Sequence, residues 1–282
     1  MESRRKFIKQ SLTGIAAFSL LPAVNTFAGQ EQGSFLKSAD APKLRFALAS
    51  DGHYGQPGTQ SDKMFADLIS WLNDEHSKKP LDFVIFNGDL VHDDPKLLEV
   101  VKLKYFNDLK MPFYAVPGNH DRCSTSRWKS VFGYEDNYVF ESKGTGFVMG
   151  NTSNEKGEYI CPDNEFLKRS LDSFKDKKVV FVVLHIPPHK WLPQETYFVH
   201  CEDTLKLLHQ YPNLKAVFHG HDHSLDGIRY TGKLPHLFDG HFGGNWGTDY
   251  KGYRIVEIDD ENKIFTYQVN AGMNPVINSK RI

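Results

Sequence analysis

The sequence predicts an α/β fold, and two observations support this prediction. Short apolar runs typical of buried strands alternate along the chain with segments whose apolar residues have helical spacing. The 282 residues are 40% hydrophobic and 24% charged, a composition that builds a folded core and argues against disorder. Residues 29–42 are polar with glycine, serine and proline and are predicted to be a linker, so the folded domain is expected at 43–282.

Apolar runs predict the strands. Each run is short and is followed by polar or turn-forming residues, as expected for strands buried in a sheet. In chain order, these runs are 44–49, 83–86, 113–116, 147–150, 179–184 and 216–218. Near the C-terminus, residues 253–258 and 263–269 are predicted to form a hairpin around the polar turn 259–262.

Four further segments are predicted to be helices. In the first, Phe65, Leu68 and Leu72 lie on one helical face. Asp94 and Pro95 precede the second and are typical capping and first-turn residues. The four helices are predicted at 63–75, 97–109, 164–174 and 204–209.

The N-terminal segment has the layout of an export signal. Arg4 and Arg5 lie in a basic stretch, and an apolar run follows at 12–24. Residues 1–28 are therefore predicted to be a signal peptide of the twin-arginine type, which implies contact with export machinery and a periplasmic location. A stable membrane anchor is not expected, because the apolar run has about 13 residues and contains Pro22, whereas a span needs about 20.

The charge balance argues against nucleic acid as a partner. The formal net charge of the whole chain is -1. Removal of residues 1–28 leaves 30 basic and 34 acidic residues, so the mature chain carries a net charge of about -4. A protein that binds the phosphate backbone of nucleic acid needs a basic surface, which this balance does not indicate.

The cysteines leave two alternatives open. The chain contains Cys123, Cys161 and Cys201, an odd number at wide spacing. In an oxidising compartment, two of them can form one disulfide, or all three can remain unpaired. Because the first cysteine is Cys123, a lipid-modified cysteine directly after the apolar run is excluded.

Five predicted strands end in residues that bind metals. Ligands of α/β sheets collect beyond the carboxyl ends of strands, so these residues are expected to converge on one cleft. Imidazoles together with carboxylate and amide oxygens suit two divalent ions, and a shared carboxylate holds such ions roughly 3.5–4 Å apart. The clusters supply Asp51, His53, Asp89, Asn119, His120, His185, His221 and His223.

Each motif by itself has an ordinary structural explanation. Asp-x-His and Gly-Asp are common in loops and turns, and Gly-His-x-His is only somewhat more specific for metal. Structural needs alone do not require all five clusters in this order, each at the end of a strand. The combination therefore predicts a metal-binding site.

This series of motifs resembles the signature of the calcineurin-like metallophosphoesterases. The resemblance implies a four-layer αββα sandwich, in which helices cover two central sheets and two divalent ions lie between the strand ends. Asp89 would bridge the ions, and Mn, Fe and Zn all suit such a site. The motifs are Asp51-x-His53, Gly88-Asp89, Gly118-Asn119-His120-Asp121, His185 and Gly220-His221-Asp222-His223. One ion is implied to take Asp51, His53, Asp89 and His223, and the other Asp89, Asn119, His185 and His221.

The implied chemistry is hydrolysis of a phosphoester by a metal-activated water. His120, next to the ligand Asn119, is then placed to donate a hydrogen bond or a proton to the leaving oxygen. Asp121 has two interpretations. It can orient the imidazole of His120, or it can cap a local turn.

Departures from the family pattern indicate a branch. The segment Gly88-Asp89-Leu90-Val91-His92 lacks the arginine of the protein phosphatases and the tyrosine ligand of the purple acid phosphatases. It is similar to the bacterial cyclic-nucleotide and glycerophosphodiester phosphodiesterases, which implies a small phosphorylated substrate. His92 is expected either to contact a metal-binding residue on the side away from the metal or to face solvent.

Two further segments are candidates for substrate contact. The glycine-rich stretch 239–247 contains Trp246, whose ring can stack on a base or sugar if the stretch forms a loop over the cleft. A packing tryptophan in a simple connection is the alternative. Lys190 and Trp191, shortly after His185, are weaker candidates.

The sequence therefore favours an enzyme that hydrolyses a phosphodiester or phosphomonoester. The competing hypothesis is a protein with this fold that binds phosphorylated ligands without turnover. The presence of His120 beside a complete ligand set favours the enzyme, because a site that only binds does not need an acid.

Overall fold

The computed structural model describes residues 41–273 and 276–282, and the predicted signal peptide and almost all of the predicted linker lie outside them. The chain divides into the units 1–41 and 42–282, and the following account concerns the second. Its helices are α1 (Ser61–Lys78), α2 (Leu97–Lys104), α3 (Thr125–Phe132), α4 (Asn164–Ser173) and α5 (Glu202–Leu208), with short 3-10 turns at η2 (Phe106–Asp108) and η3 (Asn119–Asp121). Among these residues, no helix is long and apolar enough to cross a membrane.

Two six-stranded sheets form the centre of the described unit. The first has the order β12-β11-β10-β1-β2-β3, in which β1, β2 and β3 are parallel. The second has the order β4-β5-β6-β7-β9-β8, with four parallel strands inside and antiparallel edges. The strands are β1 (Leu44–Ala49), β2 (Phe83–Asn87), β3 (Phe113–Val116), β4 (Tyr138–Ser142), β5 (Thr145–Gly150), β6 (Val179–Leu184), β7 (Leu214–His219), β8 (Ile228–Thr231), β9 (Leu234–Phe238), β10 (Gly252–Ile258), β11 (Ile264–Asn270) and β12 (Val276–Arg281).

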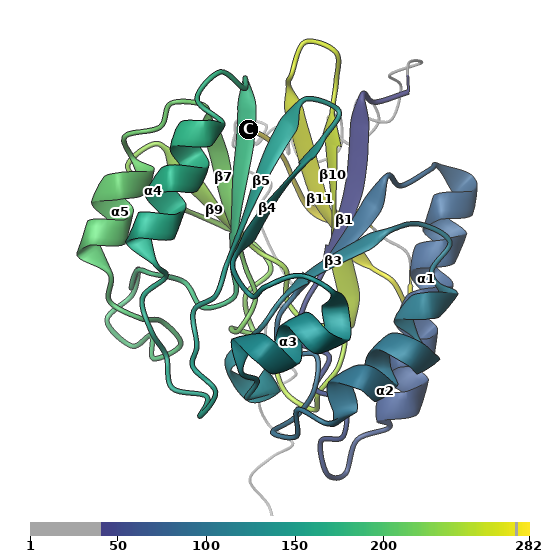
Figure 1. Ribbon diagram of the computed structural model, residues 1–282. Coiled ribbons are helices and arrows are strands. Elements are labelled where there is room, and N and C mark those ends of the chain that lie inside the picture. Colours follow the sequence, from purple (N-terminus) through teal and green to yellow (C-terminus); the bar gives the residue numbers. More distant parts are fainter. Residues whose placement is uncertain (1–40, 274–275) are drawn as a thin grey trace, which may run out of the picture. The chain divides into compact units, whose positions relative to one another are not determined.

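Three apolar clusters separate four layers. Phe46 of β1 and Phe181 of β6 belong to the cluster between the two sheets, where their rings are 5.8 Å apart. Phe65 of α1 belongs to a second cluster, in which α1, α2 and α3 cover the first sheet. Leu167 of α4 belongs to the third, in which α4 and α5 cover the second sheet. Figure 1 shows these two helix groups on opposite flanks of the strands, as the αββα sandwich requires.

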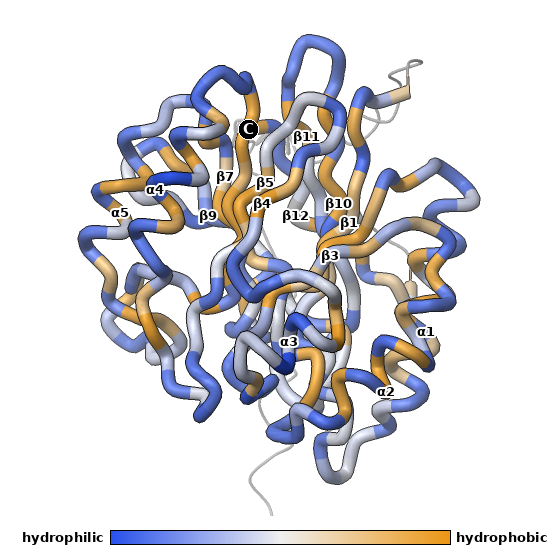
Figure 2. The backbone as a smooth tube through the Cα atoms, viewed as in Figure 1, coloured by the Kyte–Doolittle hydropathy of each residue, from blue (hydrophilic) through white to orange (hydrophobic). Residues whose placement is uncertain are grey.

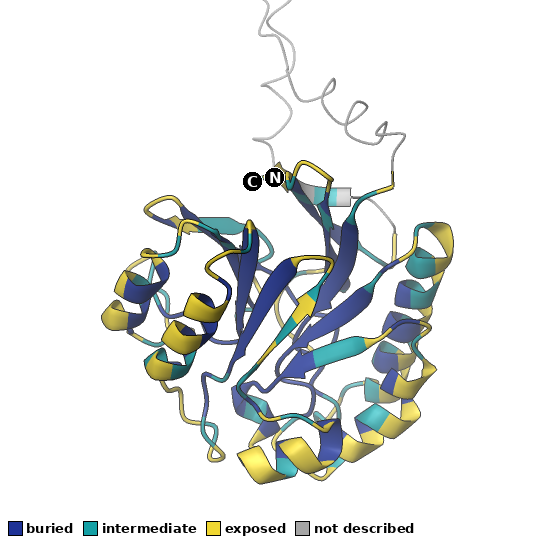
Figure 3. Cartoon of the chain, turned by 45° about the horizontal axis from the view of Figure 1, so that its top comes forward, coloured by how far each residue is buried: buried dark blue, intermediate teal, exposed yellow. Residues whose placement is uncertain are grey.

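The side chains of β1 point alternately to the helices and to the other sheet, so this strand contributes to two apolar clusters. Ala47 and Ala49 face the helices, whereas Leu44, Phe46 and Leu48 face the other sheet, because successive side chains of a strand point to opposite sides. Strands buried on both faces read as continuous apolar runs. Figure 2 shows these apolar strands inside the unit, and Figure 3 shows that its exposed residues lie mainly on the outer helix surfaces and loops.

The predicted elements are all present, and five further elements were not predicted. Strands 44–49, 113–116 and 179–184 have the predicted bounds, and the predicted helix 97–109 divides into α2 and η2. The missed elements are α3, β4, β8, β9 and β12. In β4, half-buried positions alternate with exposed ones, so the strand does not form a buried apolar run, and β9 contains Pro235 and His236, which are unusual inside a strand.

One disulfide settles the question that the cysteine spacing left open. Cys161 is bonded to Cys201, and Cys123 is free and buried. The bridge joins the segment after β5 to the segment after β6, so it connects two neighbouring loops of the second sheet.

Candidate metal centre

The seven candidate ligands lie just beyond the carboxyl ends of five strands, three in the first sheet and two in the second. All seven are buried. The two sheets therefore bring the predicted clusters, which are far apart in the sequence, together at one site. Asp51 and His53 follow β1, Asp89 follows β2, Asn119 follows β3, His185 follows β6, and His221 and His223 follow β7.

Two fully buried groups of candidate ligand atoms can be distinguished from a third, part-exposed group formed by His53, His92 and His120. The first ligand group is Asp51, His53 and His223, and the second is Asp89, His185 and His221; within each group, the candidate ligand atoms lie within 4.8 Å of one another. Asp89 Oδ2 is 3.2 Å from Nε2 of His185 and 3.6 Å from Nε2 of His53. The carboxylate of Asp89 therefore faces both groups.

Hydrogen bonds orient the imidazoles toward the centre. Nδ1 of His185 lies 2.6 Å from the carbonyl oxygen of Asn87, and Nδ1 of His223 lies 3.3 Å from that of Trp246. A carbonyl only accepts, so each Nδ1 carries the proton and each Nε2 presents a lone pair to the centre. His53 has its Nδ1 3.1 Å from Nδ1 of His92.

The nitrogen and oxygen atoms of these seven side chains suit divalent metal ions as ligand atoms. Among the described residues, Nε2 of His185, Nε2 of His221 and Oδ1 of Asn119 are buried and have no hydrogen-bond partner. Buried polar atoms without partners are rare because they lose hydration without compensation. Nε2 of His53 and of His223 are 3.0 Å apart, so both nitrogens can reach one ion. Metal ions would satisfy all of these atoms.

The negative charges at the centre also favour the binding of cations. Burial raises the pKa of Asp51, but the charges of His223 and His185 lower it more, so that it lies well below its usual range. Burial lowers the pKa of His185, but the charges of Asp89 and Asp51 outweigh this effect and raise it to about 10. Two buried carboxylates thus attract cations, and divalent ions can take the place of the proton.

Four of the ligands have unusual backbone conformations. Asp51, His53, Asp89 and His221 have φ values of 60°, 47°, 51° and 69°. This left-handed region costs side-chain-bearing residues roughly 1–3 kcal/mol each when it is enforced, and such residues concentrate at functional sites. The tight turns after β1, β2 and β7 therefore aim the side chains inward at a cost to stability.

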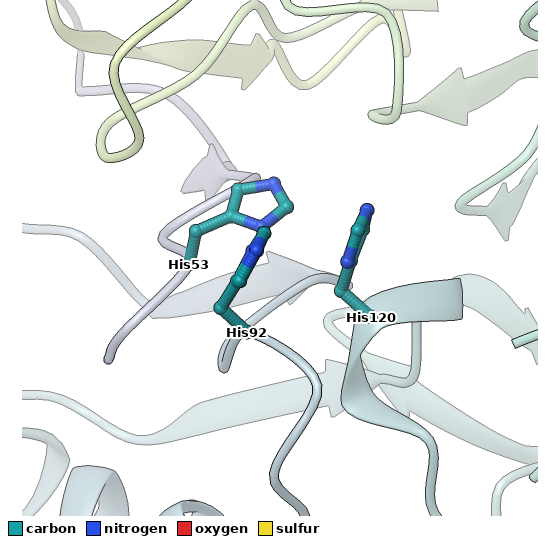
Figure 4. A group of neighbouring side chains, drawn as sticks. All are labelled: His53, His92 and His120. Atoms are coloured by element: carbon teal, nitrogen blue, oxygen red, sulfur yellow. The ribbon is translucent and has the colours of Figure 1, made fainter. Parts of the chain in front are cut away.

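His120 lies beside the first ligand group and not among the ligands. Its ring centroid is 4.9 Å from that of His53, and it stacks on His92 at 4.7 Å (Figure 4). Its backbone N–H donates to Asp89 Oδ1 over 2.7 Å, and its Nδ1 is 2.9 Å from Asp93 Oδ1. Nε2 of His120 is thus left for a substrate, because Asp93 occupies the other ring nitrogen.

Asp121 does not orient His120. Its carboxylate is fully buried and accepts hydrogen bonds from the backbone N–H groups of Gly118 and Val91, at 2.8 and 3.0 Å. Burial and the charge of Asp89 raise its pKa to about 7. Within the turn η3, the side chain of Asp121 points into the protein, whereas that of His120 remains partly exposed beside the metal centre. The contacts of Asp121 are those of a residue that caps a local turn. The carboxylate that contacts the ring of His120 is that of Asp93.

The stretch 239–247 packs against the first ligand group. The indole of Trp246 stacks on His223 with a centroid distance of 4.3 Å, and 37% of the residue remains exposed. Gly247 has φ +109°, and a Cβ there would lie too close to the Cβ of His223. The glycine is therefore needed for the loop to approach the ligand, and the loop forms part of the rim of the centre.

The segment after β6 lines a cavity, and the segments after β5 and β6 each place a tyrosine ring beside the centre. Lys190 and Trp191 line a cavity of about 440 Å³ together with Phe198. Trp191 Nε1 donates to the carbonyl of Tyr230, which fixes the indole at the wall of this cavity. The ring of Tyr197 lies 5.6 Å from that of His221, and the ring of Tyr159 lies 4.7 Å from it. Neither tyrosine was predicted, because no motif surrounds them.

Two curated proteins that are similar to this chain are named as phosphodiesterases. A probable glycerophosphodiester phosphodiesterase from Arcobacter nitrofigilis is 29% identical over 54% of this chain, and the match spans only 60% of that relative. A probable cyclic nucleotide phosphodiesterase from Fibrobacter succinogenes is 24% identical over 69% of this chain and 78% of its own length.

Solved structures show the same fold at low sequence identity. A dimetal phosphatase from Danio rerio is 12% identical, with a TM-score of 0.68 over 86% of this chain and 99% of its own. GAP50 of Plasmodium is 16% identical, with a TM-score of 0.56 over 85% and 88%. The family model described as calcineurin-like phosphoesterase matches residues 44–225, which include all seven candidate ligands. The chain belongs to the calcineurin-like phosphoesterase family.

Proposed function

We propose that this protein is a phosphoester hydrolase that uses two divalent ions and acts on a small phosphodiester or phosphomonoester. The observation that carries the proposal is the pair of ligand groups that share Asp89, with His120 beside them and outside them. The first ligand group and Asp89 would hold one ion, and the second ligand group and Asn119 would hold the other.

The ions supply activation of water and neutralisation of the phosphoryl oxygens. The chain's own residues position the remaining groups. Arg122 Nε lies 2.8 Å from Asp93 Oδ1, and Asp93 in turn holds Nδ1 of His120. When both ring nitrogens of His120 carry protons, Nδ1–H donates to Asp93 and Nε2–H is available to the leaving oxygen.

Small phosphodiesters are the favoured substrates. Both curated relatives are named as phosphodiesterases, and neither the mature charge nor the rim described above indicates a surface for nucleic acid. The metals are proposed to be Mn, Fe or Zn, because each accepts mixed imidazole, carboxylate and amide ligands.

Metal reconstitution tests this proposal. The purified protein is loaded separately with Mn²⁺, Fe²⁺ and Zn²⁺, its metal content is measured, and hydrolysis of bis(4-nitrophenyl) phosphate and 4-nitrophenyl phosphate is recorded. We expect about two ions per chain and faster hydrolysis of the diester. A chain that holds two ions and hydrolyses neither compound would support the binding protein instead, and a chain that holds fewer than two would contradict the centre.

Export is proposed from the N-terminal sequence and needs its own test. Replacement of Arg4 and Arg5 by lysine should leave the precursor in the cytoplasm if the twin-arginine route is used. Normal processing of this variant would indicate another route, and the metal centre would be unaffected by that result.

A further inference from the structure

Two tyrosine rings from different loops meet at one ligand. Tyr159, in the loop after β5, and Tyr197, in the loop after β6, both stand nearly perpendicular to the ring of His221, at interplanar angles of 89° and 87°. They are 38% and 51% exposed. Both rings border the candidate metal centre with much of their surface uncovered. Their position points to a ligand that covers them.

The two loops are fastened to each other and to the sheet. The disulfide Cys161–Cys201 lies two residues after Tyr159 and four residues after Tyr197. Tyr159 also forms a β-bridge with Ser153, and the backbone N–H of Cys201 donates to the carbonyl of Pro188. These contacts hold both rings in place before a ligand arrives, which lowers the entropy lost on binding.

The tyrosines and His120 lie at different ends of the centre. His120 contacts His53 of the first ligand group, and the tyrosines contact His221 of the second. A phosphoryl group between the two groups therefore has its leaving oxygen toward His120. Its other ester substituent then extends along the second group, past Tyr159 and Tyr197.

We propose that Tyr159 and Tyr197 form a subsite for the ester substituent that stays on phosphorus, and that this subsite selects a flat, aromatic substituent. The inference rests on the proposed hydrolase function. Aromatic rings in edge or offset contact gain energy beyond the area they bury, whereas a small alkyl substituent makes no such contact. The selected substrates are therefore diesters with one aromatic or heteroaromatic substituent.

Two diesters with the same leaving group test the subsite. Phenyl 4-nitrophenyl phosphate and methyl 4-nitrophenyl phosphate both release 4-nitrophenolate, so the demand on His120 is equal. In each reaction, the bond from phosphorus to the nitrophenyl oxygen breaks and a bond to the water oxygen forms. The products are the phenyl or methyl phosphate dianion, 4-nitrophenolate and two protons. The measured quantity is the ratio of kcat/KM for the phenyl ester to that for the methyl ester.

Tyr159→Leu and Tyr197→Leu remove the rings and keep apolar side chains of moderate size. Each should lower the ratio by about fivefold relative to the wild type, through the phenyl ester alone, since an aromatic pair contributes in this range. Tyr230→Leu is the matched control, because Tyr230 is also exposed but lies on β8, and it should leave the ratio unchanged. A ratio that both loop variants leave at the wild-type value would overturn the inference.

Binding supplies a readout that does not depend on turnover. By isothermal titration calorimetry, phenylphosphonate should bind the metal-loaded wild type several times more tightly than methylphosphonate, and Tyr159→Leu and Tyr197→Leu should remove this difference. The double variant Cys161→Ser/Cys201→Ser should lower the preference while two ions stay bound. Equal binding of both phosphonates by the wild type would overturn the subsite. A wild type that binds phenylphosphonate preferentially but hydrolyses neither ester would overturn the hydrolase function and leave the subsite intact.

Discussion

Two histidines of the first ligand group are oriented by groups outside the sheets, whereas His185 of the second group is oriented by a strand. His53 is oriented by the side chain of His92, and His223 by the loop carbonyl of Trp246. His185, in contrast, is oriented by the carbonyl of Asn87, the last residue of β2. Substitutions near the first group can therefore loosen a metal ligand, whereas the orientation of His185 is tied to the first sheet.

The rims of the two groups differ in the same way. Trp246 stacks flat on His223, and His120 and His92 lie beside His53 with part of their surface exposed. At the second group, Tyr159 and Tyr197 stand on edge against His221 on loops joined by a disulfide. The comparison suggests that the first group provides the chemistry and the second provides the selection of substrates.

The largest expected effect removes the residue that both groups share. Asp89→Ala should lose both ions and reduce hydrolysis to the background rate, because the carboxylate of Asp89 faces both ligand groups. Asp51 Oδ1 also approaches Nε2 of His53 and of His185, but at the longer distances of 3.8 and 3.9 Å. Elemental analysis and a 4-nitrophenyl ester assay measure the outcome, with Asp260→Ala, an exposed position in the turn between β10 and β11, as the control. Retention of one full equivalent of metal would mean that Asp89 serves a single ion.

The next effect separates chemistry from metal binding at the first group. His120→Ala should keep both ions and slow hydrolysis about 10²–10⁴-fold, because it removes a positioned acid. The loss should be smaller for a nitrophenyl ester than for an alkyl ester, since nitrophenolate needs little protonation. Asp93→Asn should show a weaker form of the same pattern, because it keeps His120 and changes its partner. Equal slowing of both esters would assign His120 to phosphate orientation.

A smaller effect tests how His53 is held. His92→Ala should weaken metal binding by about 10–100-fold at the first group and leave the second unchanged, because it removes the partner of Nδ1 of His53. His92→Gln should restore part of the affinity, since an amide oxygen accepts the same hydrogen bond. Stepwise metal titration measures both affinities. A decrease at both groups would contradict the division between them.

The smallest effect concerns the buried histidines behind the second group. Nδ1 of His236 lies 2.8 Å from Nε2 of His219. Burial and the charge of His219 lower the pKa of His236 well below its usual value. Below about pH 6.5, the unfolded chain binds a proton that the folded chain does not, so stability falls as the pH decreases. His236→Asn should therefore flatten the loss of melting temperature between pH 7.5 and 5, measured without metal. An unchanged slope, equal to that of the exposed control His200→Asn, would contradict this.

Much of the fold and most of the ligands were predictable because they depend on local patterns. β1 and β6 are buried on both faces, so they appear in the sequence as uninterrupted apolar runs. Ligands such as Asp51 and His185 follow these runs directly, and parallel strands bring their carboxyl ends to one edge. β9 was missed because Pro235 and His236 occupy an interior strand, and this becomes possible only when His219 and Thr231 satisfy the imidazole.

The sequence by itself determined the α/β class, the positions of the main strands and the set of candidate metal ligands, because burial and the residues at strand ends follow from local sequence. Only the tertiary structure decided that Asp93, and not Asp121, contacts His120, because the direction of each side chain depends on the turn η3. It also decided the pairing of Cys161 with Cys201 and the meeting of two tyrosines at His221. These contacts join residues of separate loops, and their distance in space is set by the packing of two sheets.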